Sequence, residues 1–526
     1  MVGIVRRARA CAAAAALILA VAAPGALGNG WEHHAIPLPA LLAALDGADA
    51  ELRAQAALSL GVRQERAAVA PLLRLLDRPE DSPGVRGPVY QALGRIGDAR
   101  AVPALLGALD AEDREELRAE AVQALGAIGD AAVVPRLLAA LDGDPSLIVR
   151  TRAIDALGHF ATPAAVEALA ALALDGKSQS VRLRALRALG ATGAAAAARP
   201  LVAALHGRGE LERGAAVDAL GRLGAAAAAG PLRALLREAD DPTLRVRIVA
   251  ALARIADPSA LPTLIEMLRD EPPAARYQAV LGLSRLGDAR AVAPLLDLYR
   301  GLADGLAARP NEALLAEAPS ALVDYALMLA TLRALVDLAP DSGLPAFLDA
   351  ARPRDFPRDS AAGLMLAEAV YELRRLALVG LGYSRAPAAA DYLAGGGPLA
   401  DPDPRLRAAA VRAIGVLGKA GAAAAVLPLL DDADGEVRRG AAAVLGRLGD
   451  GAAVGPLIAR LSDGHAGVRR EAAVGLGYLG DAAALAALLA AAEGDGDERV
   501  RAAARLSARL LGADPAQAKN ARSTTQ

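Results

Sequence analysis

The sequence predicts an all-α fold, an α-solenoid of about thirteen to fourteen helical hairpins with an irregular central insertion. Three observations predict it. The chain of 526 residues is 54% hydrophobic but only 2% aromatic, which suits many closely packed helices rich in Ala and Leu better than large globular cores. An Arg that follows an apolar residue recurs about every 32 residues. A Leu and Gly residues recur at fixed distances after this Arg, and a repeat of that length indicates a solenoid.

Residues 1–28 have the three-part layout of a secretory signal peptide. Three Arg within residues 6–9 precede an apolar run at 10–23, and small residues then occupy the two recognition positions for cleavage, Ala26 and Gly28. At 1.5 Å per residue, the 14 residues of the run are too short to span a bilayer. We therefore expect an exported protein without a stable membrane span. The alternative is an Ala-rich amphipathic first helix.

The charge and the composition of the chain indicate in which cellular compartment it is expected and which class of partner is excluded. The single cysteine, Cys11, lies in the leader, and losing the three leader Arg changes the net charge from −2 to −5. This balance excludes a general nucleic-acid binder. Arg outnumbers Lys by 55 to 3, a bias typical of GC-rich bacterial coding. We expect the mature protein in the periplasm of a GC-rich bacterium.

The recurring Arg, here called the anchor, defines an N-terminal series within 29–300 and a C-terminal series within 373–511. Leu or Ile follows it after seven positions in 12 of 13 units, and Gly after eight positions in 10 of 13. The anchors are Arg53, Arg86, Arg118, Arg150, Arg182, Arg213, Arg245 and Arg276, then Arg374, Arg407, Arg438, Arg469 and Arg501.

Each unit is predicted to form two helices. An Asp often lies four positions before the anchor, as at Asp403 and Asp434, where it would cap the start of the first helix. A Gly eleven positions after the anchor, as at Gly97, would end that helix, and the following Asp98 would cap the second. The Gly eight positions after the anchor lies inside the first helix, where it costs up to ~1 kcal/mol. We expect it to let neighbouring helices approach closely.

The anchors themselves are predicted to be structural. Because each has the same place in its unit with an Asp one turn before it, we expect a capping and inter-repeat ladder of exposed pairs, each contributing about 0.2–1 kcal/mol. The anchors assigned this role are Arg53, Arg86, Arg118, Arg150, Arg182, Arg407, Arg438 and Arg469.

The units resemble HEAT repeats, of the short kind found in phycobilisome-lyase HEAT-like proteins. The pattern is clear in VRGPVYQALGRIGDARAVPALLGAL, from Val85 to Leu109, and again from Val437 to Leu461. The resemblance covers about 38–300 and 372–511. It implies an α-solenoid and is weak evidence for any one function, because the fold carries several.

The period fails in the segment 301–372, where we expect one degenerate repeat flanked by insertions at 301–311 and 351–360. Tyr325 stands where an anchor is expected. Six of the 8 Tyr fall within 277–392.

Aromatic residues and Arg contribute most of the binding energy at interfaces, so the segment 301–372 is the predicted partner site, with Tyr325, Arg354 and Phe356 as contacts. The alternative is that larger side chains only fill wider gaps between irregular helices.

The sequence offers no catalytic residue and no metal site. The five histidines include no pair spaced for a metal on one helix turn. The GxGxxG at 475–480 lies in the repeat frame without a preceding strand, so it does not indicate a dinucleotide site. The resemblance extends to deoxyhypusine hydroxylase, whose His-Glu pairs hold iron, but no His here precedes a Glu. It extends also to bilin lyases.

We therefore expect an exported, non-catalytic scaffold that needs no cofactor and binds a protein or peptide, not nucleic acid. The alternative is an enzyme or cofactor-handling protein of the lyase or hydroxylase type, with its site in the central insertion. We expect a disordered tail at 512–526. The oligomeric state is left open.

Overall fold

The computed structural model describes residues 37–47, 49–78, 83–207, 209–270, 272–419 and 421–512. The predicted leader lies outside these ranges, as does the predicted tail beyond residue 512. The described ranges contain 29 α-helices and no strand, as the sequence predicted. None of these helices is long and apolar enough to cross a membrane.

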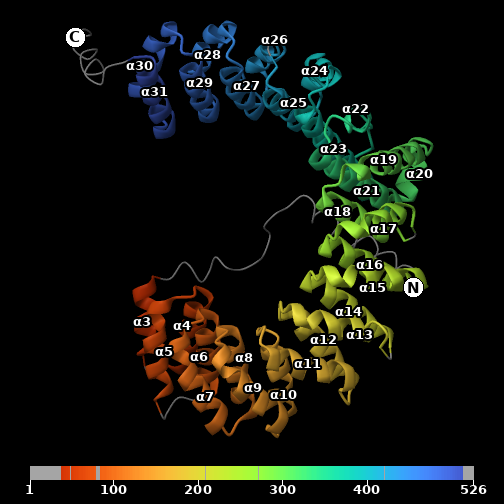
Figure 1. Ribbon diagram of the computed structural model, residues 1–526. Coiled ribbons are helices and arrows are strands. Elements are labelled where there is room, and N and C mark those ends of the chain that lie inside the picture. The colour runs from red at the N-terminus through yellow and green to blue at the C-terminus, as the bar shows by residue number, and fades with distance from the viewer. Residues whose placement is uncertain are drawn as a thin grey trace. The chain divides into compact units, whose positions relative to one another are not determined.

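The chain divides into two compact units, which join at Leu286 and Gly287 (Figure 1). We call them the N-terminal and C-terminal units. The border between the units directly follows the first helix of a hairpin. It therefore lies before residue 300, where the sequence analysis ended the N-terminal series.

The N-terminal unit consists of helical hairpins after a short opening helix α3 (Leu38–Leu45). Its first helices are α4 (Ala50–Val62), α6 (Pro83–Ile96), α8 (Glu115–Ile128), α10 (Leu147–Leu157), α12 (Gln179–Ala191), α14 (Glu210–Leu223), α16 (Pro242–Ile255) and α18 (Pro273–Leu286). Its second helices are α5 (Val69–Leu76), α7 (Val102–Ala111), α9 (Val134–Gly143), α11 (Pro163–Asp175), α13 (Ala198–Ala204), α15 (Ala229–Glu238) and α17 (Leu261–Glu266).

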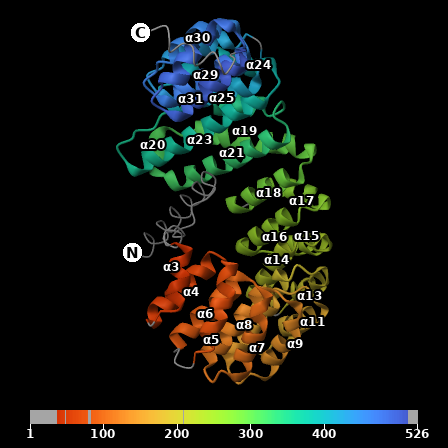
Figure 2. The ribbon, with the colours of Figure 1, turned by 90° about the vertical axis from the view of Figure 1, so that its left-hand side faces the viewer.

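First and second helices form separate layers within this unit. Figure 2 shows α13, α15 and α17 along one side and α14, α16 and α18 beside them. Each first helix packs against the next first helix in the chain. The recurring Leu seven positions after the anchor is fully buried between the layers, as at Leu60 and Leu93.

The C-terminal unit contains the irregular segment and the last repeats. Its helices are α19 (Val292–Ala307), α20 (Asn311–Ala316), α21 (Ala318–Leu338), α22 (Leu344–Ala350), α23 (Ala361–Tyr383), α24 (Pro387–Ala394), α25 (Pro404–Leu417), α26 (Ala423–Val426), α27 (Gly435–Leu448), α28 (Val454–Arg460), α29 (Ala466–Leu479), α30 (Leu485–Gly494) and α31 (Glu498–Leu510). Helices α21 and α22 form the expected degenerate repeat. The first insertion lengthens α19, and the second is the non-helical loop 351–360.

The predicted helix ends are confirmed. Asp403 and Asp434 accept hydrogen bonds from main-chain N–H groups at the starts of α25 and α27. Asp98 does so at the short 3₁₀ turn that leads into α7. Gly97 ends α6 with a φ of 71°, a conformation that an L side chain rarely adopts. These local devices mark each hairpin.

The Gly eight positions after the anchor lies where two first helices touch. A Cβ added to Gly126 would lie 2.7 Å from the Cβ of Ala156 on the next first helix. The same pairing joins Gly61 to Ala92, Gly94 to Ala124, Gly158 to Ala188, Gly190 to Ala219, Gly221 to Ala251 and Gly382 to Ala413. The close approach that the sequence predicted is therefore present along the stack.

We predict opposite effects for two Gly→Ala substitutions inside helices. Gly126→Ala should lower the free energy of unfolding by about 1–3 kcal/mol, because the new methyl group meets the Ala156 backbone. Gly107→Ala in α7 has nothing within 4 Å of the new Cβ and should raise it by about 0.5–1 kcal/mol through helix propensity. Urea unfolding followed by circular dichroism measures both. Equal shifts of the two midpoints would contradict the steric explanation.

Candidate functional site

The loop 351–360 is fastened to the end of α19 by Arg354. Its guanidinium donates to the main-chain oxygens of Leu306 and Arg309, both at 3.0 Å. Asn311 donates in turn to the main-chain oxygen of Asp355 at 2.9 Å. The last carbonyls of a helix lack partners within the helix, so Arg354 satisfies groups that would otherwise need water. The loop is thereby held in one place.

Two of the three residues predicted to contact a partner are buried. Tyr325 on α21 is 2% exposed and Phe356 is 6% exposed, so each side chain presents little surface to a partner. The Tyr325 hydroxyl has no hydrogen-bond partner among the described residues, and burial raises the pKa of this tyrosine. The Arg354 guanidinium lies 5.7 Å from the centre of the Phe356 ring. Arg354 is partly exposed, and both Arg354 and Phe356 line the pocket described below, whereas Tyr325 is not among its lining residues. That the three residues contact a partner stays a prediction.

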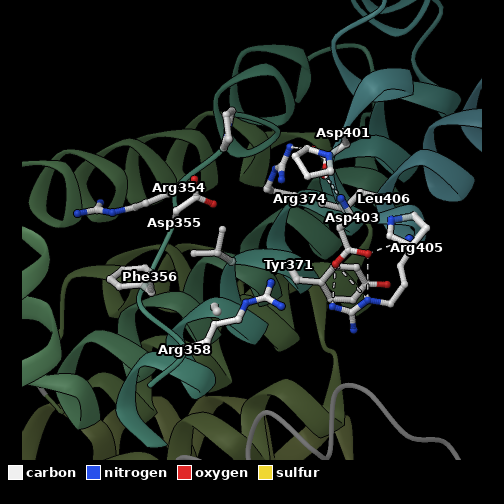
Figure 3. Close-up of a pocket in the computed structure, with 15 residues that line it drawn as sticks. Arg354, Asp355, Phe356, Arg358, Tyr371, Arg374, Asp401, Asp403, Arg405 and Leu406 are labelled. Atoms are coloured by element: carbon white, nitrogen blue, oxygen red, sulfur yellow. Dashed lines mark hydrogen bonds and ion pairs between the residues drawn. The ribbon is translucent and has the colours of Figure 1, made fainter. Parts of the chain in front are cut away.

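An open pocket of about 560 Å³ lies directly beside this loop. It is formed by the loop, the N-terminal half of α23 and the start of α25 (Figure 3). Its lining residues are Pro353, Arg354, Asp355, Phe356, Arg358, Ala367, Val370, Tyr371, Arg374, Asp401, Pro402, Asp403, Pro404, Arg405 and Leu406. The predicted segment thus contributes to the pocket, but the sequence analysis missed the residues from 401 onwards.

A stacked pair forms one wall of the pocket. The Arg405 guanidinium lies 3.8 Å from the centre of the Tyr371 ring, as Figure 3 shows. Arg405 also donates to both carboxylate oxygens of Asp403 and pairs with Glu368 at 3.4 Å. Its side chain is still 48% exposed. Stacking and pairing hold this exposed cation and the half-buried ring in one orientation.

Some charged side chains of the pocket form ion pairs within the protein, and one does not. Arg374 pairs with Asp401, and Arg405 pairs with Asp403. The pKa of Asp403 is lowered, because the hydrogen bonds from Arg405 outweigh the opposing effect of burial. Arg358 is exposed, and no hydrogen bond or ion pair with a described residue engages it, although its charge also favours the ionised Asp403.

The lining can bind but is poorly suited to proton transfer. Arg side chains stay protonated at any physiological pH, and a carboxyl group with a lowered pKa is a weak base. The pocket offers cations, two aromatic faces and carboxylates on a held frame. Among the described residues, no group of three or more His, Cys, Asp or Glu is placed to hold a metal ion.

The anchors form a ladder between repeats. In the C-terminal unit, Arg407 pairs with Asp432 at 2.7 Å, and Arg438 donates to the main-chain oxygen of Asp432 at 2.8 Å. Arg438 then pairs with Asp463, to whose main-chain oxygen Arg469 donates. The first contact of the ladder is the ion pair between Arg374 and Asp401. At its other end, Arg469 pairs with Asp495, and Arg501 donates to the main-chain oxygen of Asp495.

The ladder differs from the expected one in its partners and its burial. The Asp one turn before the anchor caps the helix, whereas the paired acid belongs to the next repeat. Arg438 and Asp463 have side chains only 18% and 4% exposed, so these are not surface pairs. The sequence could not show this partner because it lies 25 residues away, and only the stacking of repeats brings it close.

The N-terminal unit has a less complete ladder. Arg86, Arg118 and Arg182 pair with carboxylates of the next repeat, Glu112, Asp144 and Glu212. Arg53 donates to the main-chain oxygen of Gly47, Arg150 to that of Asp144 and Arg182 to that of Gly176. Gly176 stands 26 positions after Arg150, where other repeats carry the acid, which explains why Arg150 has only the main-chain contact.

A family model of HEAT repeats matches residues 38–126, 108–182, 231–315, 364–443 and 423–509. The chain belongs to the HEAT-repeat family. The matches cover most of both regular series, apart from 183–230, and reach into the central segment, in agreement with the resemblance seen in the sequence. None of the curated proteins compared with the sequence matches it.

Solved structures of similar fold include nuclear-transport HEAT-repeat proteins. A structure of Kap95p with RanGDP is 15% identical, with a TM-score of 0.54, and the match covers 91% of this chain and 73% of that one. A Kap95:Nup1 complex is 15% identical, with a TM-score of 0.53, and covers 94% and 76%. At this identity the likeness shows the α-solenoid fold alone.

Human deoxyhypusine hydroxylase also matches, at 28% identity over 47% of this chain and 95% of that one, with a TM-score of 0.23. A superposition this poor does not support a shared activity.

We predict that the ladder makes the protein sensitive to acid. The hydrogen bond from Arg407 lowers the pKa of Asp432, so the folded state holds its proton less tightly than the unfolded state, where the value is about 3.9. Stability from this pair is complete well above that value and is lost as the pH falls through and below it. Asp432→Asn should lower the free energy of unfolding at pH 7 by about 3 kcal/mol and flatten its decline below pH 5.

Urea unfolding at several pH values measures both effects. The matched control is Asp110→Asn, because Asp110 pairs with Arg136 on an exposed surface and should change stability by less than about 1 kcal/mol. Similar losses for both variants would contradict the ladder.

Proposed function

We propose that this protein is an exported, non-catalytic scaffold that binds a protein partner at the pocket beside the loop 351–360. The observation that carries the proposal is the stack of the exposed Arg405 guanidinium on the half-buried Tyr371 ring, with the unengaged Arg358 facing it across the pocket (Figure 3). Tyr and Arg are the residue types that dominate binding energy at protein interfaces. The pocket lies where the repeat period fails, and such interruptions of a solenoid often serve binding.

The surface is arranged before any partner arrives. Arg354 fixes the loop to α19, and Asp403 and Glu368 orient Arg405. Ordering a loop or a long side chain on binding costs free energy. Because the loop and Arg405 are already ordered in the free protein, most of that cost does not arise on binding. A preformed surface of this kind suits a folded or extended protein partner.

The charge pattern favours a partner with both signs of charge. Arg358 and the exposed face of Arg405 attract carboxylates, whereas the exposed Asp355 attracts a cation. The proteins of this fold in the structures described above are bound to RanGDP and to Nup1, which fits a protein partner in general terms.

The alternative function is an enzyme or cofactor-handling protein with its site in the same segment. Elemental analysis and an absorption spectrum of the purified protein distinguish the two functions. A stoichiometric metal or a visible chromophore would contradict the non-catalytic scaffold.

We predict that a photoreactive amino acid in place of Arg358 becomes covalently linked to a protein partner upon illumination in a periplasmic extract. The same amino acid in place of Arg199, an exposed position on α13, serves as the control and should give no such product. Mass spectrometry of the linked species identifies the partner and its contact.

The charge itself is tested by Arg358→Glu. Because no described residue pairs with Arg358, the melting temperature should stay unchanged, while capture of the identified partner should fall about tenfold, the loss of one charge-assisted contact. Capture at full strength by this variant would exclude the pocket as the binding surface.

We also propose that the chain is exported and cleaved after Gly28. The expected result in a GC-rich bacterial host is a periplasmic protein whose first residue is Asn29. Cell fractionation with intact-mass measurement tests this. An uncleaved chain recovered in the cytoplasmic fraction would contradict it.

A further inference from the structure

Seven of the thirteen repeats carry an acid at one fixed position, one carries a cation there, and the other five carry Ala or Thr. Twelve positions after the anchor lie Glu65, Asp98, Asp130, Asp257, Asp288, Asp450 and Asp481. Six of these, all but Glu65, accept hydrogen bonds from main-chain N–H groups at the start of the next helical segment. In the repeat of α25 this position is Lys419, and in the repeat of α23 it is Ala386, preceded by Arg385.

The two altered loops line a second pocket of about 560 Å³ in the C-terminal unit. Tyr383 and Val416, at the ends of α23 and α25, contribute apolar surface, while Arg385 and Lys419 contribute cations, and no acid lines the pocket. The Asp341 carboxylate accepts hydrogen bonds from the Ser384 hydroxyl and from the Arg385 main-chain N–H. Asp341 thus holds the turn that presents Arg385.

The cations of this surface are unengaged. No hydrogen bond or ion pair with a described residue involves the side chains of Arg385, Lys419 or Arg447. Arg447 lies at the end of α27, and its guanidinium would be 2.9 Å from a Cβ added at Gly415 of α25. It therefore extends over the end of the preceding first helix, towards the pocket.

Exposed apolar side chains lie in register with these cations. Nine positions after the anchor, successive first helices end in Tyr383, Val416, Arg447 and Tyr478. Tyr383, Val416 and Tyr478 are 55%, 51% and 64% exposed. Helices α23, α25, α27 and α29 pack in this order (Figure 1), so the four side chains form one row across the helix ends.

We infer that this row, with Arg385 and Lys419, is a second docking surface, and that it takes an extended acidic peptide with a carboxylate at every third position and apolar residues between. Neighbouring helices lie ~9 Å apart, which is about three residues, or one turn, of a chain in the extended polyproline II conformation. A peptide crossing the helix ends would therefore place every third side chain against one repeat. Carboxylates match the three unengaged cations, and apolar residues match Tyr383, Val416 and Tyr478.

Residues 513–526 are unsuited to be this occupant. They carry Lys519 and Arg522 against Asp514, so their side chains have the same sign of net charge as the surface. A nucleic acid fits less well than a peptide, because cations alternate here with aliphatic and aromatic side chains and do not form the continuous basic track that a phosphate backbone requires.

The surface is separate from the pocket of the proposed function. Both lie along α23, with Tyr371 near one and Tyr383 at the other, about 18 Å apart along the helix axis. A substitution at one need not affect the other.

The test uses the full-length mature protein and a fluorescein-labelled peptide with Glu at every third position and Leu between, followed by fluorescence anisotropy. Lys419→Asp restores the acid found in seven other repeats, so the fold is retained. Combined with Arg385→Glu, it should weaken binding about tenfold for each cation replaced. The matched control for Lys419→Asp is Arg199→Asp, which changes the charge by the same amount at an exposed position of the N-terminal unit. It should bind like the wild type, and so should Arg358→Glu.

The expected result includes loss of binding when Gln replaces Glu in the peptide, and weaker binding by Tyr478→Ala at an unchanged melting temperature. Three results would overturn the inference. They are no binding by the wild-type protein, equal affinity of the wild type and the Lys419→Asp, Arg385→Glu variant, and tighter binding of a single-stranded oligonucleotide than of the peptide.

Discussion

The stacking of this solenoid depends on one steric constraint, which is that two facing backbones nearly touch where first helices cross. At most crossings the first partner is Gly and the second is Ala, as in Gly126 and Ala156. Between α16 and α18 the order is reversed: Ala253 occupies the usual Gly position and faces Gly282. Because the exchange keeps the pair small, the constraint acts on the pair and not on one position.

The ladder of anchors requires this spacing. An Arg side chain spans from one repeat to a carboxylate of the next only if the first helices lie close, as Arg407 does to Asp432 at 2.7 Å. Once paired, each acid serves a second purpose, since Asp432 also accepts from the main-chain N–H of Asp434 before α27. Apolar stacking and charge pairing therefore specify the same register, which is the consistency expected of a chain with one folded state.

Local features of the fold were predictable from the sequence, whereas contacts between repeats were not. Asp403 and Gly97 act within a few residues of themselves, so their roles as a cap and a helix end follow from spacing. The partner of Arg438 lies in the next repeat, and the wall formed by Arg405 lies beyond the segment where the period failed. Tyr325 and Phe356 were expected at the surface because enrichment in aromatic residues does not distinguish a binding face from a filled gap.

Because the chain is periodic, each residue can be compared with the residue usual at its position in the other repeats. Where a residue differs from the usual one and the surrounding structure makes up for the change, the difference is structural. Where nothing makes up for it, a functional reason is indicated. Tyr325 replaces an anchor Arg, but it is buried beneath a loop that Arg354 fastens, so the surrounding structure accommodates the change. Lys419 replaces a capping acid, and α26 then begins without a side-chain cap, at a cost of about 1 kcal/mol. No described residue pairs with Lys419, so no hydrogen bond or ion pair of this side chain with a described residue offsets that cost. A loss of stability without internal compensation is expected where selection acts on binding, which is why the ends of α23 and α25 carry the stronger indication of a ligand.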